Sequence, residues 1–317
     1  MVRPEIVCFS GNPALDRRLR LSSVRLGAVN RAVSVESLPG GKAAHVAMGF
    51  AALGGTPVWT GFLGRAIGQE CGAALRTLGI NVATIPTAAP TRVNLELIED
   101  SGTVTEILEP GAAPTEQEQA GMIESCVKAF GGDWKGAILM ISGSLPTGMR
   151  PEFYASLIAA AHASGSKVFL DTSGDWLLCS LEERPDFVKI NCSEAAVLMP
   201  TPGNGRDSAI AAATEMLKRG AKSAAITLGE NGVVWLESSS GPLWMARPPK
   251  IDCISPVGCG DAAFAGFAHA ALKGISGGDA IRFAAACGAA NCLASQAGRI
   301  AMRDVQSLSP RIHVERL

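Results

Sequence analysis

Short apolar segments alternate with helical segments through the second half of the chain, and this alternation constrains the fold more than any other feature. Strands are predicted at GAILMIS (136–142), KVFLD (167–171) and DFVKI (186–190), with helices near 115–130 and 150–164 and another helix after DFVKI. AAITLGENGVVW (224–235) predicts a strand, a glycine loop and a second strand, and helices are expected near 260–273 and 278–295. This order is typical of an α/β protein whose mostly parallel sheet is covered by helices on both faces.

Two other segments have a different pattern. Residues 18–38 and 92–107 alternate polar and apolar side chains, as strands exposed on one face do, and Ser101-Gly102 suits a hairpin turn in the second segment. We expect these segments to form a small β lid inserted in the larger fold. An isolated sheet of this kind leaves apolar surface and open edges exposed, so we also expect a homodimer formed through the lid.

The composition excludes several classes of protein. The 317 residues carry a net charge of −1, which provides no electrostatic footprint for nucleic acid or an anionic membrane. No apolar run is long enough to span a bilayer, and the run near the N-terminus is too short for a signal peptide. The nine cysteines include no CxxC pair, so we expect a cytoplasmic protein with neither disulfides nor structural zinc.

The segment ISPVGCGDAAFAGF (254–267) is the strongest candidate for chemistry. Gly258 and Gly260 leave a turn without Cβ atoms just before an apolar helix, and the free N–H groups at a helix N-terminus attract anions. Asp261 follows the turn at once. The functional interpretation is that the turn holds a transferring phosphoryl group while Asp261 accepts the proton of the attacking hydroxyl. The alternative is that Asp261 caps an ordinary helix.

A second glycine turn opens a helix at GGKAAHVAMGFAALGG (40–55). Lys42 and His45 are three residues apart and share one face of its first turn, where they are candidates to bind a phosphate or a hydroxyl. The alternative is a solvated lysine and a packed histidine. The segment is not a Walker A motif, because Glu36 replaces its first glycine and Ala43 replaces its serine or threonine.

Polar residues also follow several predicted strands, where α/β sheets place ligand groups. Asp16 follows the apolar strand at 5–9, in a segment with turn character. Asp171 is the last residue of KVFLD and follows the apolar residues of that strand. Asn191 and Glu194 lie between a strand and a helix. They suit either a metal site or a capping box, in which the two residues bond each other's backbone N–H groups.

Nine motifs occur in the order found in the ribokinase-like (PfkB) carbohydrate kinases, and the sequence most resembles their branch of 1-phosphofructokinases and tagatose-6-phosphate kinases. The motifs are NPALD, VNR, PGGKAAHVA, TRVN, SGSLP, LDTSG, KxNxxE, TLGxxG and PVGCGD. They run nearly end to end, so the resemblance implies one ribokinase-like kinase domain over residues 1–317. It implies a doubly wound α/β fold with a β lid, ATP with Mg²⁺ as phosphoryl donor, and a sugar phosphate as acceptor.

The resemblance also implies roles for single residues. Asp261 is the expected catalytic base, and its anion hole is made of Gly258, Cys259 and Gly260. The expected sugar-phosphate contacts are Asp16, Gly40, Gly41, Lys42, His45, Arg92 and Ser144. The expected nucleotide contacts are Lys189, Asn191, Glu194, Thr227, Gly229, Gly232 and Asn291. Among these, Asn191 and Glu194 are expected to organise Mg²⁺ through water, because this ion dehydrates reluctantly.

Two departures from the family pattern stand out. His45 replaces the usual Asn of GGKGINVA, and Ile190 replaces the usual Pro of KPNxxE. With an ordinary histidine pKa, His45 would make sugar affinity change between about pH 6 and 7. The favoured acceptor is fructose 1-phosphate, and tagatose 6-phosphate and fructose 6-phosphate remain alternatives. A kinase for an unphosphorylated sugar or nucleoside is another alternative, as is a catalytically silent sugar-phosphate-binding protein. A dehydrogenase is disfavoured because no GxGxxG follows the first strand.

Overall fold

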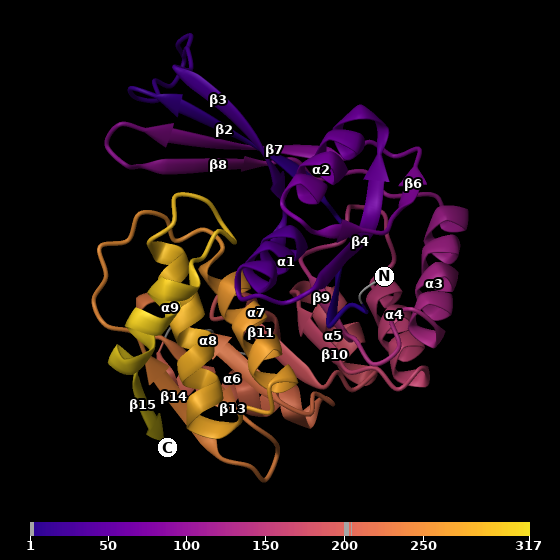
Figure 1. The fold of residues 1–317 in the computed structure, drawn as a ribbon, viewed down its shortest axis with the longest axis vertical. Coiled ribbons are helices and arrows are strands. Elements are labelled where there is room, and N and C mark those ends of the chain that lie inside the picture. The colour runs from indigo at the N-terminus through magenta and orange to yellow at the C-terminus, as the bar shows by residue number, and fades with distance from the viewer. Residues whose placement is uncertain (1–2, 200–202, 204) are drawn as a thin grey trace.

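A large, mostly parallel sheet forms the centre of the computed structural model, which describes residues 3–199, 203 and 205–317 (Figure 1). The sheet has 11 strands in the order β15-β14-β13-β12-β11-β10-β9-β1-β4-β5, with β6 paired to β4. The strands from β12 to β5 run parallel, while β13, β14 and β15 are added antiparallel at one edge. Their bounds are β1 Ile6–Ser10, β4 Pro57–Gly64, β5 Asn81–Val82, β6 Ile85–Thr87, β9 Ile138–Ser142, β10 Val168–Asp171, β11 Phe187–Asn191, β12 Ala224–Thr227, β13 Val233–Leu236, β14 Leu243–Arg247 and β15 His313–Arg316. The predicted α/β class is confirmed.

Alternate residues of the central strands face two separate hydrophobic cores. In β1, Ile6 and Cys8 belong to one core, whereas Val7 and Phe9 belong to the other. The first core is covered by α1 Lys42–Ala52, α2 Arg65–Thr77, α7 Cys259–Leu272, α8 Gly277–Cys292 and α9 Met302–Leu308. The second core is covered by α3 Glu116–Gly131, α4 Glu152–Ala163, α5 Gly174–Glu182 and α6 Arg206–Lys218. In the described part of the chain, no helix has both the length and the apolar character needed to cross a membrane.

A separate four-stranded sheet projects from this body and corresponds to the expected lid (Figure 1). Its order is β3-β2-β7-β8, with β2 and β7 parallel and the two outer pairs antiparallel. The bounds are β2 Ala14–Leu21, β3 Ser34–Gly40, β7 Arg92–Glu99 and β8 Val104–Leu108. The sheet therefore begins four residues before the expected segment 18–38.

The structure corrects the expected position of Asp16, because β2 begins earlier in the sequence than predicted. The sequence analysis placed Asp16 in a turn after the first strand, but the structure places it within β2, opposite Leu38 of β3 and Asn94 of β7. The backbone N–H and C=O groups of β2 are hydrogen-bonded to β3 on one side and to β7 on the other. These bonds outweigh the local turn preference of Asn12-Pro13. As a result Asp16 is fixed by the lid rather than by the central sheet.

The helix expected after β11 is shorter than predicted. Residues Glu194–Leu198 form a 3₁₀ helix, and Met199 is already extended. Pro200 follows in the sequence, and the residue before a proline is disfavoured in the α region. Two further 3₁₀ turns lie at Gly229–Asn231 and Ser309–Arg311.

Candidate active site

Asp261 lies in the first turn of α7, three residues after the N-cap Gly258. No side chain caps this helix, so the interpretation of Asp261 as a helix cap is wrong. Within the residues that the structure describes, the N–H groups of Gly258, Gly260 and Asp261 have no recorded acceptor. Free N–H groups and the helix dipole together favour an anion at this point.

Close packing explains why glycine is needed at the turn. Gly258 has a φ of +81°, and a Cβ added there would lie 2.6 Å from the Cβ of Ala297. Asn291 ties the two segments together: its Nδ2 donates to the carbonyl of Val257 (2.7 Å), and its Oδ1 accepts from the N–H of Gly298 (2.9 Å). Asn291 is fully buried, and its predicted contact with the nucleotide base stays a prediction.

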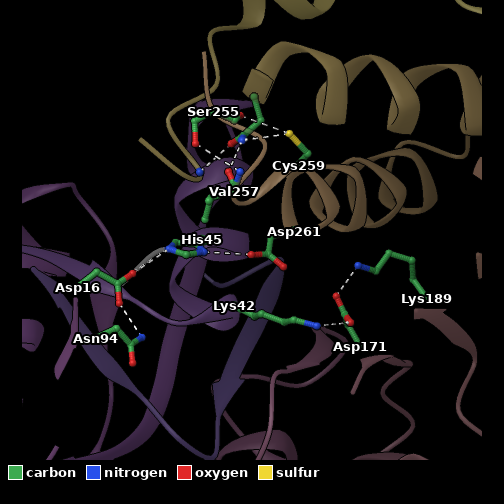
Figure 2. Close-up of polar contacts among 12 residues, drawn as sticks. Asp16, Lys42, His45, Asn94, Asp171, Lys189, Ser255, Val257, Cys259 and Asp261 are labelled. Carbon is green, nitrogen blue, oxygen red and sulfur yellow. Dashed lines mark hydrogen bonds and ion pairs between the residues drawn. The ribbon is translucent and has the colours of Figure 1, made fainter. Parts of the chain in front are cut away.

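His45 of α1 joins Asp261 to the lid. Its Nδ1 lies 3.0 Å from Oδ2 of Asp261, and its Nε2 lies 3.5 Å from Oδ2 of Asp16 (Figure 2). Asn94 extends the chain of contacts, because its Nδ2 donates to Oδ1 of Asp16 over 2.8 Å. All four side chains are buried. A continuous polar connection therefore runs from β7 through β2 and α1 to α7.

The two carboxylates decide the charge of His45. Burial alone lowers the pKa of this imidazole, but hydrogen bonds to Asp16 and Asp261 and the charges of both outweigh burial and raise the pKa to about 10. His45 is thus an imidazolium at neutral pH. The expectation that it titrates between pH 6 and 7 is wrong, because the sequence does not reveal its two anionic partners.

Lys42 points to a second buried carboxylate instead of the first. Its Nζ lies 2.6 Å from Oε1 of Glu194. It also lies 3.2 Å from Oδ1 of Asp171, and the Nζ of Lys189 lies 2.5 Å from the other oxygen of Asp171 (Figure 2). Burial raises the pKa of the Asp171 carboxyl, but the two lysines more than offset it and hold that pKa low. Lys42 and His45 start from the same helical turn, yet they contact different carboxylates.

Asn191 and Glu194 form the capping box that the sequence allows. The N–H of Asn191 donates to Oε2 of Glu194, and the N–H of Glu194 donates to Oδ1 of Asn191, each over 2.8 Å. The capping box uses only Oε2 of Glu194, so Oε1 can accept a hydrogen bond from Lys42. The capping interpretation is therefore confirmed, and water-mediated Mg²⁺ binding by the same two residues stays a prediction.

The other predicted nucleotide residues lie at the carboxyl ends of β11 and β12. Thr227 is in register with Asn191, and Gly229 opens the 3₁₀ turn between β12 and β13. Gly232 has a structural reason for being glycine: its φ is +100°, and a Cβ would collide with the carbonyl oxygen of Ala246 in β14.

The predicted sugar residues surround the base of the lid. Gly40 ends β3, and a Cβ there would collide with the carboxylate of Asp16. Gly41 is the N-cap of α1 with a φ of +82°, and Ser144 lies just beyond β9. Arg92 donates to the carbonyl oxygens of Glu109 (2.7 Å) and Asn12 (3.2 Å).

A small pocket opens between the lid and α1, and its lining includes Asp16, His45, Glu96 and Gln296. Two nearby atoms are buried without a hydrogen-bond partner among the described residues, Nε of Arg92 and Oδ1 of Asn94. Buried unpaired polar atoms are unfavourable, so both are natural contacts for a polar ligand.

Two residues of the site, Asn94 and Asp171, could not be assigned a role from the sequence. Asn94 is one residue of the motif TRVN, and Asp171 simply follows the apolar residues of a strand. The signal that identifies Asp171 is its complete burial beside two lysines, which follows from the neighbouring strand β11 and the helix α1.

His45 provides a test of these electrostatics through protein stability. A folded pKa of about 10, against an ordinary value of 6.5, gives a stabilisation that is fully present below pH 6.5 and is lost as pH rises through 10. We expect the free energy of unfolding of wild type relative to His45→Asn, measured with urea, to decrease steadily over this range. The replacement of the exposed His313 by Asn controls for loss of a histidine. A difference that is constant with pH would contradict the imidazolium assignment.

Comparison with known proteins shows relatives over most of the chain. The model of the pfkB family carbohydrate kinases matches residues 13–303. A 1-phosphofructokinase of Vibrio cholerae is 30% identical over 90% of this chain and 88% of its own length. A 1-phosphofructokinase of Rhodobacter capsulatus is 32% identical, over 89% of this chain and 88% of its own.

Solved structures show the same fold. The tetrameric inhibited form of phosphofructokinase-2 from Escherichia coli superimposes with a TM-score of 0.89 and 29% identity, covering 98% of this chain and 99% of that chain. An Arabidopsis thaliana ribokinase, at 22% identity and a TM-score of 0.76, shares the fold over the same fractions. The family model and these relatives cover most of the sequence, and this chain belongs to the pfkB family of carbohydrate kinases.

Proposed function

We propose that the protein transfers the γ-phosphoryl group of ATP to a hydroxyl of a ketohexose phosphate. The acceptor that we favour is fructose 1-phosphate, which gives fructose 1,6-bisphosphate. The observation that carries this proposal is the buried Asp261 beside free N–H groups at the start of α7, connected through His45 to the lid. The two relatives named 1-phosphofructokinase support the choice of acceptor. We propose that residues 1–317 act as one kinase domain, with 18–38 and 92–107 as its lid.

Asp261 is the proposed proton acceptor. His45 occupies Oδ2 of this carboxylate, which leaves Oδ1 for the acceptor hydroxyl. Because His45 also contacts Asp16 of the lid, the orientation of the base depends on the position of the lid. The N–H groups at the start of α7 are the proposed donors to the phosphoryl group as charge shifts onto its oxygens.

The two lysines that share Asp171 are the proposed cations for the phosphate groups. Lys189 is buried beside the turn, since a Cβ at Gly260 would lie 3.0 Å from its Nζ. ATP supplies the phosphoryl group and Mg²⁺ shields its charge. The oxygen atoms of Asn191 and Glu194 would hold such an ion through water, because each already accepts one hydrogen bond but has a second lone pair for a water molecule.

A phosphate on the acceptor fits the lid better than a neutral sugar. Arg92 has a buried, unpaired Nε, and a phosphate oxygen would satisfy this donor through a charge-assisted bond. An Escherichia coli phosphofructokinase-2 has been solved with fructose-6-phosphate, so fructose 6-phosphate is the second candidate here, together with tagatose 6-phosphate. A neutral sugar and a silent binding role have no comparable support.

The lid also supports the proposal of a homodimer. Six of the eleven most exposed large apolar side chains of the described residues lie in the lid or its connecting loop, namely Leu26, Val29, Val33, Val35, Ile107 and Leu108. The edge strands β3 and β8 carry three of them. A second copy would cover this surface and its open edges. We further propose a cytoplasmic location, where nine cysteines stay reduced.

Activity with a panel of acceptors tests the function. We expect MgATP-dependent phosphorylation of fructose 1-phosphate to exceed that of fructose 6-phosphate, tagatose 6-phosphate and free fructose. Asp261→Asn should lower kcat by ~10²–10⁴, the usual contribution of a general base, while ATP binding is kept. A preference for free fructose, or an Asp261→Asn variant with nearly normal kcat, would rule out the proposed reaction.

Arg92 tests the recognition of the acceptor phosphate. Arg92→Ala should raise KM for the sugar phosphate ~10-fold or more and leave KM for ATP nearly unchanged, because a charge-assisted bond contributes about 1.5–3 kcal/mol. Arg92→Lys should recover only part of the loss, since lysine lacks the planar fork. The exposed Arg20 of β2 provides the control replacement by Ala. Equal effects of the two Ala variants would argue against a phosphate contact by Arg92.

Light scattering tests the assembly. At micromolar concentration we expect a dimer, and Val35→Lys combined with Ile107→Lys should shift it to monomers. Val127→Lys replaces a comparably exposed side chain on α3, away from the lid, and should leave the dimer intact. A monomeric wild type would contradict the assembly through the lid.

A further inference from the structure

Two cysteine thiols meet directly behind the glycine turn. Cys259 is the first residue of α7, and Cys292 is the last residue of α8. Their Sγ atoms lie 3.3 Å apart. Cys253 is exposed, and its side chain lies within hydrogen-bonding reach of Cys292. Neither the predicted role of Cys259 in the anion hole nor any other part of the proposed reaction requires this pairing.

The backbone holds the pair in place. The carbonyl oxygen of Cys292 accepts hydrogen bonds from the N–H groups of Ile254 (2.7 Å) and Ser255 (3.4 Å), which fixes the start of the turn to the end of α8. At the other end of the turn, Asn291 holds the carbonyl of Val257. Both thiols are partly exposed, so a small reagent has access to them. The two sulfur atoms therefore need only a short movement to bond.

The two thiols differ in reactivity. Cys259 lies at a helix N-terminus, where the dipole favours a thiolate, and Figure 2 shows its sulfur beside the turn residues. Hydrogen bonds from Cys292 and Asn291 lower the pKa of Cys259, whereas the same contact with Cys259, together with burial, raises the pKa of Cys292. Burial raises the pKa of the enclosed thiols Cys8 and Cys287 to well above the usual range, which makes them unreactive.

We propose that Cys259 and Cys292 form an oxidisable pair through which peroxide switches off the phosphoryl site. The Cys259 thiolate attacks one oxygen of hydrogen peroxide, the O–O bond breaks and a sulfenic acid forms. The departing hydroxide takes up the proton that the Cys259 thiol released and leaves as water. The Cys292 thiol then attacks the Cys259 sulfur, an S–S bond replaces the S–O bond, and a second water leaves. In sum, two thiols are oxidised to one disulfide as one peroxide is reduced to two waters.

The new bond would displace the donors of the turn. A disulfide requires about 2.05 Å between sulfur atoms, compared with 3.3 Å here, so the ends of α7 and α8 must approach each other. Cys259 lies between Gly258 and Gly260, whose N–H groups are the proposed phosphoryl donors. A misplacement of about 1 Å at a reacting centre costs on the order of 10² in rate. Oxidation of the pair would therefore change the positions of the N–H donors in the turn.

Peptide mapping of the full-length protein tests the bond without any assay of activity. After treatment with hydrogen peroxide and blocking of free thiols, mass spectrometry should find the Cys259–Cys292 disulfide in wild type and in Cys179→Ala. Cys179 is a partly exposed cysteine on α5 and serves as the matched control. The cross-link should persist in Cys253→Ala and be absent from Cys292→Ala. A Cys253–Cys292 disulfide in wild type, or no disulfide at either site, would overturn the proposal.

Kinase activity, which rests on the proposed function, provides the second readout. Peroxide should lower kcat of wild type by ~10-fold or more, in step with the mapped disulfide, and dithiothreitol should restore it. In Cys292→Ala the Cys259 sulfenic acid has no resolving thiol and oxidises further, so dithiothreitol should restore much less activity than in wild type. Wild type that forms the disulfide but keeps full activity would overturn the switch. A protein that forms the disulfide but is inactive with all acceptors before oxidation would refute the proposed function instead.

Discussion

The hydrogen-bonded contact of His45 with Asp16 and Asp261 connects the lid with the first turn of α7, the two parts of the molecule on which the proposed reaction depends. Asp16 belongs to the lid sheet, Asp261 to the first turn of α7, and His45 to α1 between them. An imidazolium with two carboxylate partners is stable when buried, because each N–H has an acceptor and each charge has a counter-charge. If the lid moved away, His45 would lose one partner and Asp16 would keep only its contact with Asn94. The position of the lid is thereby linked to the setting of the proposed base.

A second set of buried charges organises the other side of the site. Asp171 has no exposed side-chain surface and lies between Lys42 and Lys189, while Glu194 binds Lys42 and accepts a hydrogen bond from the N–H of Asn191. Truncating one member of such a network leaves another charge buried without compensation, which is far more costly than the loss of a surface ion pair. These lysines are therefore preorganised by the protein, and they need little reorganisation to meet a phosphate.

Close backbone approach is the third constraint on the site. Gly258 packs against Ala297, and Gly298 packs so closely against α1 that an added Cβ would lie 2.7 Å from the carbonyl oxygen of His45. The turn before α7, the segment 297–298 and the first turn of α1 therefore cannot move independently. This packing gives a physical reason why the oxidation state of Cys259, within that turn, would affect donors on either side of it.

The order of strands and helices and the α/β class could be predicted from the sequence, as could the segments of the small sheet, because these depend on local periodicity, glycine positions and ordered motifs. Which candidate residues meet depends on contacts between distant parts of the chain. Only the ladder pairing of β2 moves Asp16 from a turn into the lid, and only the approach of both β2 and α7 to α1 gives His45 two carboxylates and a raised pKa. Lys42 and His45 looked equivalent along one helix face, yet Lys42 contacts Asp171 and His45 contacts Asp261, which are 129 and 216 residues further along the chain. Charge state and partner choice depend on such distant contacts, and no local pattern records them.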